Sequence, residues 1–387
     1  MDFALTESQE MIRKEVAALS RGFSMDYWLE KDEKAEYPHE FVKAFAEAGW
    51  LGLMVPEAYG GAGLGVTEAS IMMHEICASG AGTSGASPIH FYVFPPTPVI
   101  KFGTDAQKRK HLPGICTGET VMAFGVTEPN AGTDTSRIQT RAVKQGDRWI
   151  VNGRKVWTTN AQHANKFLLL ARTSERDPAR PLKGMTLFFT AFDRSAISVR
   201  LIHKLGRAAV DSNEIVIENL EIPEEDVIGN VGDGFYHLLE SLNPERIVVG
   251  IEAVGIGRAA LDRAVQYAKE RIVFDRPIGK NQAIAHPLAH AAAQLEAAEL
   301  LCLKAAWLFD TGRPCGKEAN SAKMLAAEAG FNACDAALQT FGGFGYAREF
   351  YVERLWREVR LYKIAPVSQQ MALNYLAERV LGLPKSY

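Results

Sequence analysis

Cysteine, excess basic charge and long apolar runs are all scarce in this sequence, and each absence excludes a class of protein. Five cysteines stand far apart among 387 residues without a CxxC pair, which indicates reduced thiols rather than a disulfide framework. The formal net charge is −3, so no basic surface predicts a nucleic-acid partner. No apolar run reaches membrane-spanning length, so no membrane partner is expected.

Targeting and nucleotide-binding signatures are also missing. The segment MDFALTESQEM lacks the basic start and apolar core of a secretory signal, and LPKSY is not a peroxisomal address, so a cytoplasmic location is expected. No Walker A motif occurs. The segment GGFGYAR at 342–348 follows a predicted helix, where a helix cap and turn fits as well as any nucleotide contact. His286 and His290 have the spacing of two metal ligands, but a third ligand is not apparent, so we predict no metal site.

The periodicity of the remaining sequence changes twice, and the composition of 47% apolar and 23% charged residues is that of a globular protein. Residues 1–120 have helical spacing, with Thr6 and Gln9 forming a predicted capping box. Residues 121–232 contain seven short alternating runs, which predict a β-sandwich or barrel-like domain. Residues 233–387 are helical again and predict a four-helix bundle. The expected fold class is therefore α+β.

The stretch FGVTEPNAGTDTSRIQTRAVKQGDRWIVNGRKVWTTN at 124–160 is the most informative part of the chain. It begins with small and polar residues around a proline, and it ends with an aromatic residue before two threonines. Such a loop offers backbone N–H groups and hydroxyl donors to a bound ligand. We therefore interpret this stretch as the floor of a cofactor site.

Four motifs in order, FGVTEPNAGTD, WIVNGRKVWTTN, RIVFDRPIGKNQ and QTFGGFGY, resemble the acyl-CoA dehydrogenase family. The resemblance covers nearly the whole chain. It implies an FAD-dependent enzyme of fatty acid metabolism that converts an acyl-CoA thioester to the trans-2-enoyl-CoA. It also implies a homotetramer that passes electrons to an electron-transfer flavoprotein.

The resemblance assigns two groups of residues to FAD. The group near the flavin ring and phosphates comprises Phe124, Val126, Thr127, Gly132, Thr133, Trp157, Thr158 and Thr159. Ser368 and Gln370 are also expected to bind FAD. A second group, for the diphosphate and adenosine end, comprises Arg271, Phe274, Gln282, Gln339, Gly342 and Gly343. Arg271, Phe274 and Gln282 would come from a neighbouring subunit. Asp275 departs from the family pattern, which usually has glycine after the phenylalanine.

The family needs a carboxylate base to remove the α-proton of the thioester. Most members carry this glutamate in a C-terminal loop, where the present chain reads KIAPVSQQ and has Pro366. A minority, including the isovaleryl and long-chain enzymes, carry it on the first long helix of the bundle, where the matching residue is Glu245. We expect Pro244 to begin this helix with Asn243 as its N-cap. Burial in a dry pocket raises the pKa of such a base, and the helix dipole would then lower the pKa of Glu245 and oppose this effect.

Substrate contacts follow from the same resemblance. Thr133, Asn243 and Arg246 are expected to bind the acyl-CoA. In the family, the backbone N–H of the residue matching Pro366 helps to hold the thioester oxygen, and proline has no N–H. Either a neighbouring N–H replaces it, or the chemistry differs. Two alternatives stay open: an oxygen-using flavin oxidase or monooxygenase, and a non-catalytic scaffold.

Overall fold

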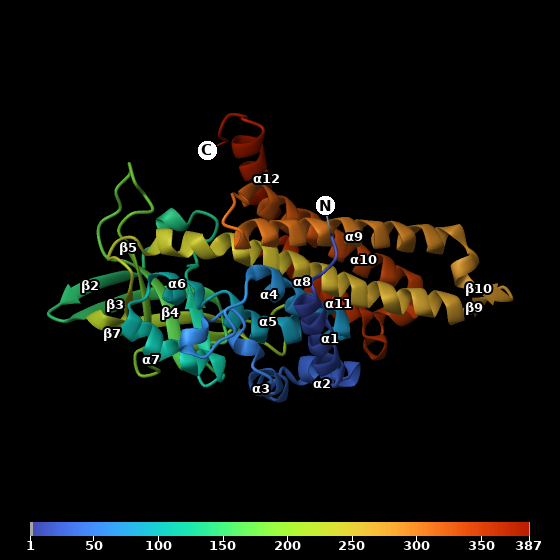
Figure 1. The fold of residues 1–387 in the computed structure, drawn as a ribbon, viewed down its shortest axis with the longest axis horizontal. Coiled ribbons are helices and arrows are strands. Elements are labelled where there is room, and N and C mark those ends of the chain that lie inside the picture. Colours follow the sequence, from blue (N-terminus) through green and yellow to red (C-terminus); the bar gives the residue numbers. More distant parts are fainter. Residues whose placement is uncertain (1–2, 387) are drawn as a thin grey trace.

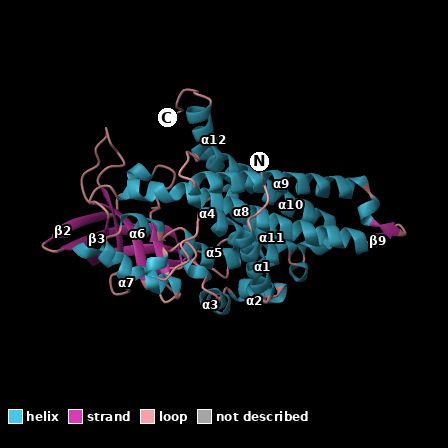
Figure 2. Cartoon of the chain, viewed as in Figure 1, coloured by secondary structure: helices cyan, strands magenta, loops and turns pink. Residues whose placement is uncertain are grey.

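The computed structural model describes residues 3–386 and has a helical part, a β part and a second helical part in chain order (Figures 1 and 2). The predicted α+β fold is therefore confirmed. The β part lies at one end of the molecule, and long helices form the middle and extend to the other end (Figure 1).

The first helical part contains α1 (Glu7–Arg21), α2 (Met25–Lys34), α3 (His39–Glu47), α4 (Val66–Ile76), α5 (Gly82–Val93), α6 (Thr97–Phe102) and α7 (Asp105–Cys116). The predicted capping box is present: the Thr6 hydroxyl accepts from the Gln9 N–H at 3.3 Å, and the Gln9 side chain accepts from the Thr6 N–H at 3.0 Å. These reciprocal bonds fix the start of α1. Its apolar face then packs through Ile12 and Val16.

The β part contains β1 (Met122–Gly125), β2 (Arg141–Gln145), β3 (Arg148–Thr159), β4 (Lys166–Arg172), β5 (Met185–Ala191), β6 (Ile197–Leu201), β7 (Ser212–Pro223) and β8 (Val227–Ile228). The strand order is β6-β7-β3-β2-β4-β5-β8, with β1 beside β4. All seven predicted strands form. The two halves of the sheet meet where Arg141 pairs with Arg172. The ring centroids of Trp149 and Phe188, from opposite halves, are 5.9 Å apart, so the sheet folds back on itself.

The side chains of β4 point alternately to two sides of the strand and so contact both the β part and the helices. Phe167 and Leu169 pack into the interior of the folded sheet, whereas Leu168 and Leu170 belong to the core shared with the helices. Because successive side chains of a strand point to opposite faces, a run of apolar residues serves both cores. The β part is thereby fixed against the helices.

The second helical part contains α8 (Gly234–Glu270), β9 (Ile272–Val273), β10 (Arg276–Pro277), α9 (Gln282–Asp310), α10 (Gly316–Phe341), α11 (Val352–Val359) and α12 (Gln369–Tyr375). The predicted fourth long helix is divided into α11 and α12. A 3-10 turn at Arg360–Lys363 follows α11, and Pro366 lies before α12. Proline cannot donate the hydrogen bond that would continue a helix.

The predicted start of the first long helix is wrong. Helix α8 begins at Gly234 and continues through Pro244, so Asn243 is not its N-cap. Proline in a helix interior costs about 3 kcal/mol. Packing of the earlier turns outweighs this cost, because Phe235 and Leu238 are buried and Gly234 lies directly against the backbone of β5.

Residues 3–386 contain no helix that combines the length and the apolar composition needed to cross a membrane. In the same range, no three side chains of His, Cys, Asp or Glu group in a way that could hold a metal ion. His286 and His290 are both exposed on α9. All five cysteines are free thiols.

A buried ion pair connects the two helical parts. Arg354 and Glu358, one turn apart on α11, are fully buried and lie 3.0 Å apart. The Glu358 carboxylate also accepts from the N–H and hydroxyl of Thr83 at 2.6 and 2.8 Å and from the Ser84 hydroxyl at 2.7 Å. A carboxylate at the N-terminus of α5 satisfies donors that the helix itself leaves unpaired.

We predict that Glu358→Gln destabilises the folded protein by about 3–5 kcal/mol, because the Arg354 charge would stay buried without its counterion. Urea unfolding measures this change. Glu47→Gln is the matched control, since the Lys43–Glu47 pair is exposed on both sides and should contribute about 0.5 kcal/mol or less. Equal effects of the two substitutions would contradict the prediction.

Candidate active site

The predicted cofactor loop begins where β1 leaves the sheet. Phe124 lies within β1. The chain then turns tightly between Glu128 and Ala131, whose backbone N–H and carbonyl groups form hydrogen bonds with each other. The Thr127 carbonyl accepts from the Val156 N–H at 2.9 Å, so the loop lies against β3. Gly132 and Thr133 follow the turn and are exposed, which leaves their polar groups available to a ligand.

A buried ion pair holds this loop in place. The Lys155 ammonium, with no exposed surface, donates to the Glu128 carboxylate at 2.9 Å and to the Val126 carbonyl at 3.0 Å. Glu128 also accepts from the N–H groups of Gln139 and Thr140. Burial raises the pKa of Glu128, but the Lys155 charge and these donors outweigh it and hold the pKa below its usual value. Glu128 is therefore a structural carboxylate.

An irregularity in β3 turns Trp157 out of the sheet. The pairing with β7 shifts between Lys155 and Thr158, and Trp157 has a φ of 61°. Its indole is 59% exposed. Thr158 Oγ1 and Asn160 Oδ1, beside it, are buried and have no hydrogen-bond partner among residues 3–386. An exposed ring next to unpaired polar atoms suits a flat ligand with hydrogen-bonding edges, so these residues fit a flavin.

Glu245 lies within α8 and is 8% exposed. Because eleven helical residues precede it, the expectation that the helix dipole lowers its pKa is wrong. Burial instead raises the pKa of Glu245 to about 7, against the opposing charges of His90 and Arg246. No donor within the described part of the chain lies in hydrogen-bond range of its carboxylate. A buried, unbonded carboxylate with this pKa can accept a proton near neutral pH.

Cationic side chains surround this carboxylate. The Arg246 guanidinium donates to the Asn243 side chain at 3.0 Å, while its buried Nε has no partner in residues 3–386. From α10, Lys323 is buried and faces both Glu245 and Arg246, and burial lowers its pKa to about 8. The Lys323 ammonium also donates to the Val367 carbonyl. Helix α10 therefore anchors the Pro366 loop in the same region as Glu245.

The loop around Pro366 offers a different donor from the one expected. Pro366 has no N–H, but the next residue, Val367, does, and nothing in the described structure accepts from it. Ser368 then caps α12 by accepting from the Met371 N–H at 3.3 Å. Gln370 lies in the first turn of α12. Val367 was not identified from the sequence.

The second group of predicted residues lies at the opposite end of the molecule. Arg271 and Phe274 are at the β9–β10 hairpin, beyond the end of α8 (Figure 1). Gln282 begins α9, and Gln339, Gly342 and Gly343 lie at the end of α10. The Arg271 guanidinium is 5.7 Å from the ring centroid of Phe344, which joins the two segments. Phe274 is 90% exposed.

Within one chain, the two ends of α8 are far apart. At roughly 1.5 Å per residue, Glu245 and Arg271 are about 39 Å apart along this helix. Asp275 has a φ of 60° and follows Phe274 at a φ of 51°, so the hairpin turns where the family usually has glycine.

A buried polar cluster beside Glu245 was not predicted. His90 of α5, Glu252 of α8 and Tyr362 are buried and hydrogen-bonded together. The Arg207 guanidinium donates to Ser87 at 3.0 Å and to Thr159 at 3.4 Å. These residues come from distant segments, so spacing does not reveal them. The one available signal is a charged residue, such as Glu252, within an apolar helical run.

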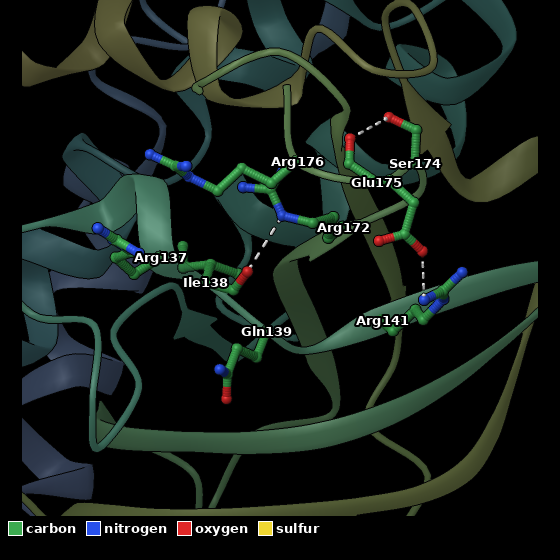
Figure 3. Close-up of a pocket in the computed structure, with 8 residues that line it drawn as sticks. All are labelled: Arg137, Ile138, Gln139, Arg141, Arg172, Ser174, Glu175 and Arg176. Carbon is green, nitrogen blue, oxygen red and sulfur yellow. Dashed lines mark hydrogen bonds and ion pairs between the residues drawn. The ribbon is translucent and has the colours of Figure 1, made fainter. Parts of the chain in front are cut away.

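A separate cavity of about 290 Å³ on the β part is lined by Arg137, Ile138, Gln139, Arg141, Arg172, Ser174, Glu175 and Arg176 (Figure 3). Its cations are already bound within the protein. The Arg172 guanidinium donates to the Ile138 carbonyl at 3.1 Å, and Arg141 lies 2.7 Å from Glu175. Arg176 donates to the Ser136 carbonyl at 3.2 Å. We assign no ligand to this cavity.

Three family models cover most of the chain. They describe the acyl-CoA dehydrogenase N-terminal domain over residues 6–119, the middle domain over residues 123–220 and the C-terminal domain over residues 232–381. The boundaries lie close to the changes of periodicity in the sequence.

Full-length relatives agree with these matches. The chain is 38% identical to acyl-CoA dehydrogenase FadE12 of Mycobacterium bovis over 100% of this chain and 99% of that one. It is 37% identical to a 3-(aryl)acrylate reductase of Clostridium sporogenes, over 97% and 99%. It is 33% identical to the Caffeyl-CoA reductase-Etf complex subunit CarC of Acetobacterium woodii, over 95% and 96%.

Solved structures show the same architecture. Butyryl-CoA dehydrogenase from Megasphaera elsdenii superposes with a TM-score of 0.93 at 31% identity, over 98% of this chain and 100% of that one. The FAD complex of PigA superposes with a TM-score of 0.92 at 25% identity, over 99% and 100%. With matching domains, relatives and architecture, the chain belongs to the acyl-CoA dehydrogenase family, whose members are oxidoreductases.

Proposed function

We propose that this protein is an FAD-dependent dehydrogenase that converts an acyl-CoA thioester to the trans-2-enoyl-CoA, with Glu245 as the base. The observation that supports it most is the buried, unbonded carboxylate of Glu245. Structural carboxylates such as Glu128 have their hydrogen bonds satisfied. A buried carboxylate with a raised pKa and no hydrogen-bond donor from the described chain fits a catalytic role.

FAD is held, in this proposal, by the loop after β1 and by the end of β3. Trp157 would pack against the flavin ring, and the hydroxyls of Thr127, Thr158 and Thr159 would supply hydrogen bonds to its polar edge. When bound, FAD supplies the acceptor for the hydride that leaves the β-carbon of the substrate. The Lys155–Glu128 pair fixes the loop before any ligand binds, which lowers the entropic cost of binding.

Glu245 takes the α-proton onto a carboxylate oxygen as the β-hydride leaves, so that the thioester loses two hydrogens and gains a double bond. The thioester oxygen gathers negative charge during this step and needs donors. We propose that the Val367 N–H replaces the donor that Pro366 lacks. Arg246, Asn243 and Thr133 bind the CoA portion of the substrate.

The second FAD-binding group comes from a neighbouring subunit. The 39 Å estimate along α8 and the exposed Phe274 support a site shared between two chains. Gln282, Gln339, Gly342 and Gly343 lie at the same end as Arg271 and Phe274. We propose a homotetramer, in keeping with the family.

The electron acceptor is proposed to be an electron-transfer flavoprotein. Support comes from the relative that is a subunit of a complex with such a protein. The cytoplasmic location stays a prediction, as do acyl chain length and branching. An oxidase or monooxygenase remains the second candidate, since Pro366 removes the donor used by most members.

We predict that Glu245→Gln keeps FAD and acyl-CoA binding but slows anaerobic bleaching of the flavin by at least about 10²-fold, because the α-proton loses its acceptor. Glu240→Gln is the matched control, since Glu240 is an exposed glutamate on the same helix. Stopped-flow absorbance measures both rates. Normal bleaching by the Glu245 variant would refute the base assignment, and rapid reoxidation of the reduced protein by air would favour the oxidase.

The rate of flavin bleaching should increase with pH. Glu245 accepts a proton only when ionised, and its pKa of about 7 means that ionisation is completed above neutral pH. We therefore predict a single-turnover rate that rises about tenfold per pH unit below pH 7 and levels off above it. A rate that is flat or falls with increasing pH would contradict this prediction.

A complementation experiment tests the shared site. Arg271→Ala should lose FAD, and Glu245→Gln should keep FAD but not bleach. When the two variants are co-expressed, a mixed pair of chains contains one site with both native residues. Random pairing should then restore about one quarter of the wild-type activity. Activity no higher than the average of the two separate variants would place both residues in a single-chain site.

A further inference from the structure

The polar cluster beside Glu245 contains a second carboxylate of α8, that of Glu252, which is hydrogen-bonded to His90 and Tyr362. Glu252 Oε1 lies 2.9 Å from Nδ1 of His90, and Glu252 Oε2 accepts from the Tyr362 hydroxyl at 2.7 Å. All three side chains are buried. Because Glu252 can only accept hydrogen bonds when ionised, the proton in the His90 bond belongs to Nδ1. Each oxygen of Glu252 therefore has its own donor.

This arrangement favours the charged form of His90. Burial by itself would lower the pKa of His90, but the charge of Glu252 and its hydrogen bond outweigh burial and raise the pKa above its usual value. The charge of Glu245 acts in the same direction. The nearby Arg207, from the loop after β6, acts in the opposite one.

The two carboxylates of α8 differ in what surrounds them. Glu245 and Glu252 are two turns apart, or about 10 Å along the helix, and His90 of α5 interacts electrostatically with both. Glu252 is fully bonded, whereas Glu245 has no donor in the described structure. Of the charges near Glu245, that of His90 favours its ionised form most. Two titratable groups with divergent environments fit different roles.

Other charged groups also act on Glu245. Arg246 and Glu252 lie on α8, and Lys323 of α10 has a pKa that burial lowers to about 8. Arginine stays protonated throughout the working range. The charge of His90 depends on its hydrogen-bonded partner Glu252, which a conservative substitution can neutralise.

We propose that His90 is a positioning residue, kept as an imidazolium by Glu252, and that it sets the pH at which Glu245 becomes a competent base. This inference rests on the proposed role of Glu245. The competing explanation is that His90, Glu252 and Tyr362 only clamp α5 to α8.

The Glu252→Gln variant separates these explanations by the sign of its effect. If Glu252 acts on Glu245 directly, removing its negative charge favours ionised Glu245 and shifts the rate–pH profile to lower pH. If it acts through His90, the imidazolium is lost and the profile shifts to higher pH. We expect a shift to higher pH of about one to three units, the effect of a nearby opposite charge. A downward shift, or none, overturns the proposal.

Two further variants control for folding. His90→Gln removes the charge directly and should shift the profile upwards as Glu252→Gln does. Tyr362→Phe removes a hydrogen bond from Glu252 but no charge, so its profile should stay near that of the wild type while its stability falls. If all three variants lose stability and activity without moving the profile, the cluster is a clamp and the proposal is wrong.

The protonation of His90 can also be measured directly, without a catalytic assay. Histidine NMR of the purified protein should show a His90 imidazole that stays protonated at higher pH in the wild type than in Glu252→Gln. If no acyl-CoA bleaches the wild-type flavin, the proposed function fails, and this titration still decides whether Glu252 holds His90 charged. If bleaching occurs but His90 titrates identically in both proteins, the inference about His90 fails alone.

Discussion

The length of α8 constrains the whole molecule. This helix has 37 residues and spans about 56 Å. It begins against β5, carries Glu245 beside the Pro366 loop, and ends at the β9–β10 hairpin. The packing of Phe235 and Leu238 at its start compensates for Pro244 in its interior. As a result, Glu245 lies inside the protein rather than at a helix end, and desolvation controls its protonation.

Buried charges in this fold divide into two kinds. Glu128 and Glu358 each accept several hydrogen bonds and face a buried cation, so they hold segments together. Such pairs are costly to break, although their net contribution to stability can be small. Glu245 is equally buried but lacks donors. A group left unsatisfied in this way is typical of sites where function takes precedence over stability.

Periodicity predicts much of this fold, because patterns of two and 3.6 residues report directly which faces are buried. The seven strands and the capped start of α1 follow from it. The start of α8 could not be predicted, since local rules for Pro244 point to a helix start and tertiary packing overrides them. The same error adds a helix-dipole effect that would oppose the rise in the pKa of Glu245 caused by burial.

The candidate site is harder to predict from the sequence than the fold is. Loop residues such as Thr127 and Trp157 could be assigned only because consecutive motifs resemble a family, and their roles stay predictions. The cluster of His90, Glu252 and Tyr362 depends on three segments meeting in space. Val367 becomes a candidate only once the hydrogen bonds around Pro366 are known.

The exposed hairpin at the end of α8 has a thermodynamic consequence. If two chains complete each site, cofactor binding and subunit association are linked equilibria, and each strengthens the other. Dilution would then release cofactor even though no residue that touches it has changed. The affinity of the protein for its cofactor would be a property of its concentration as much as of its sequence.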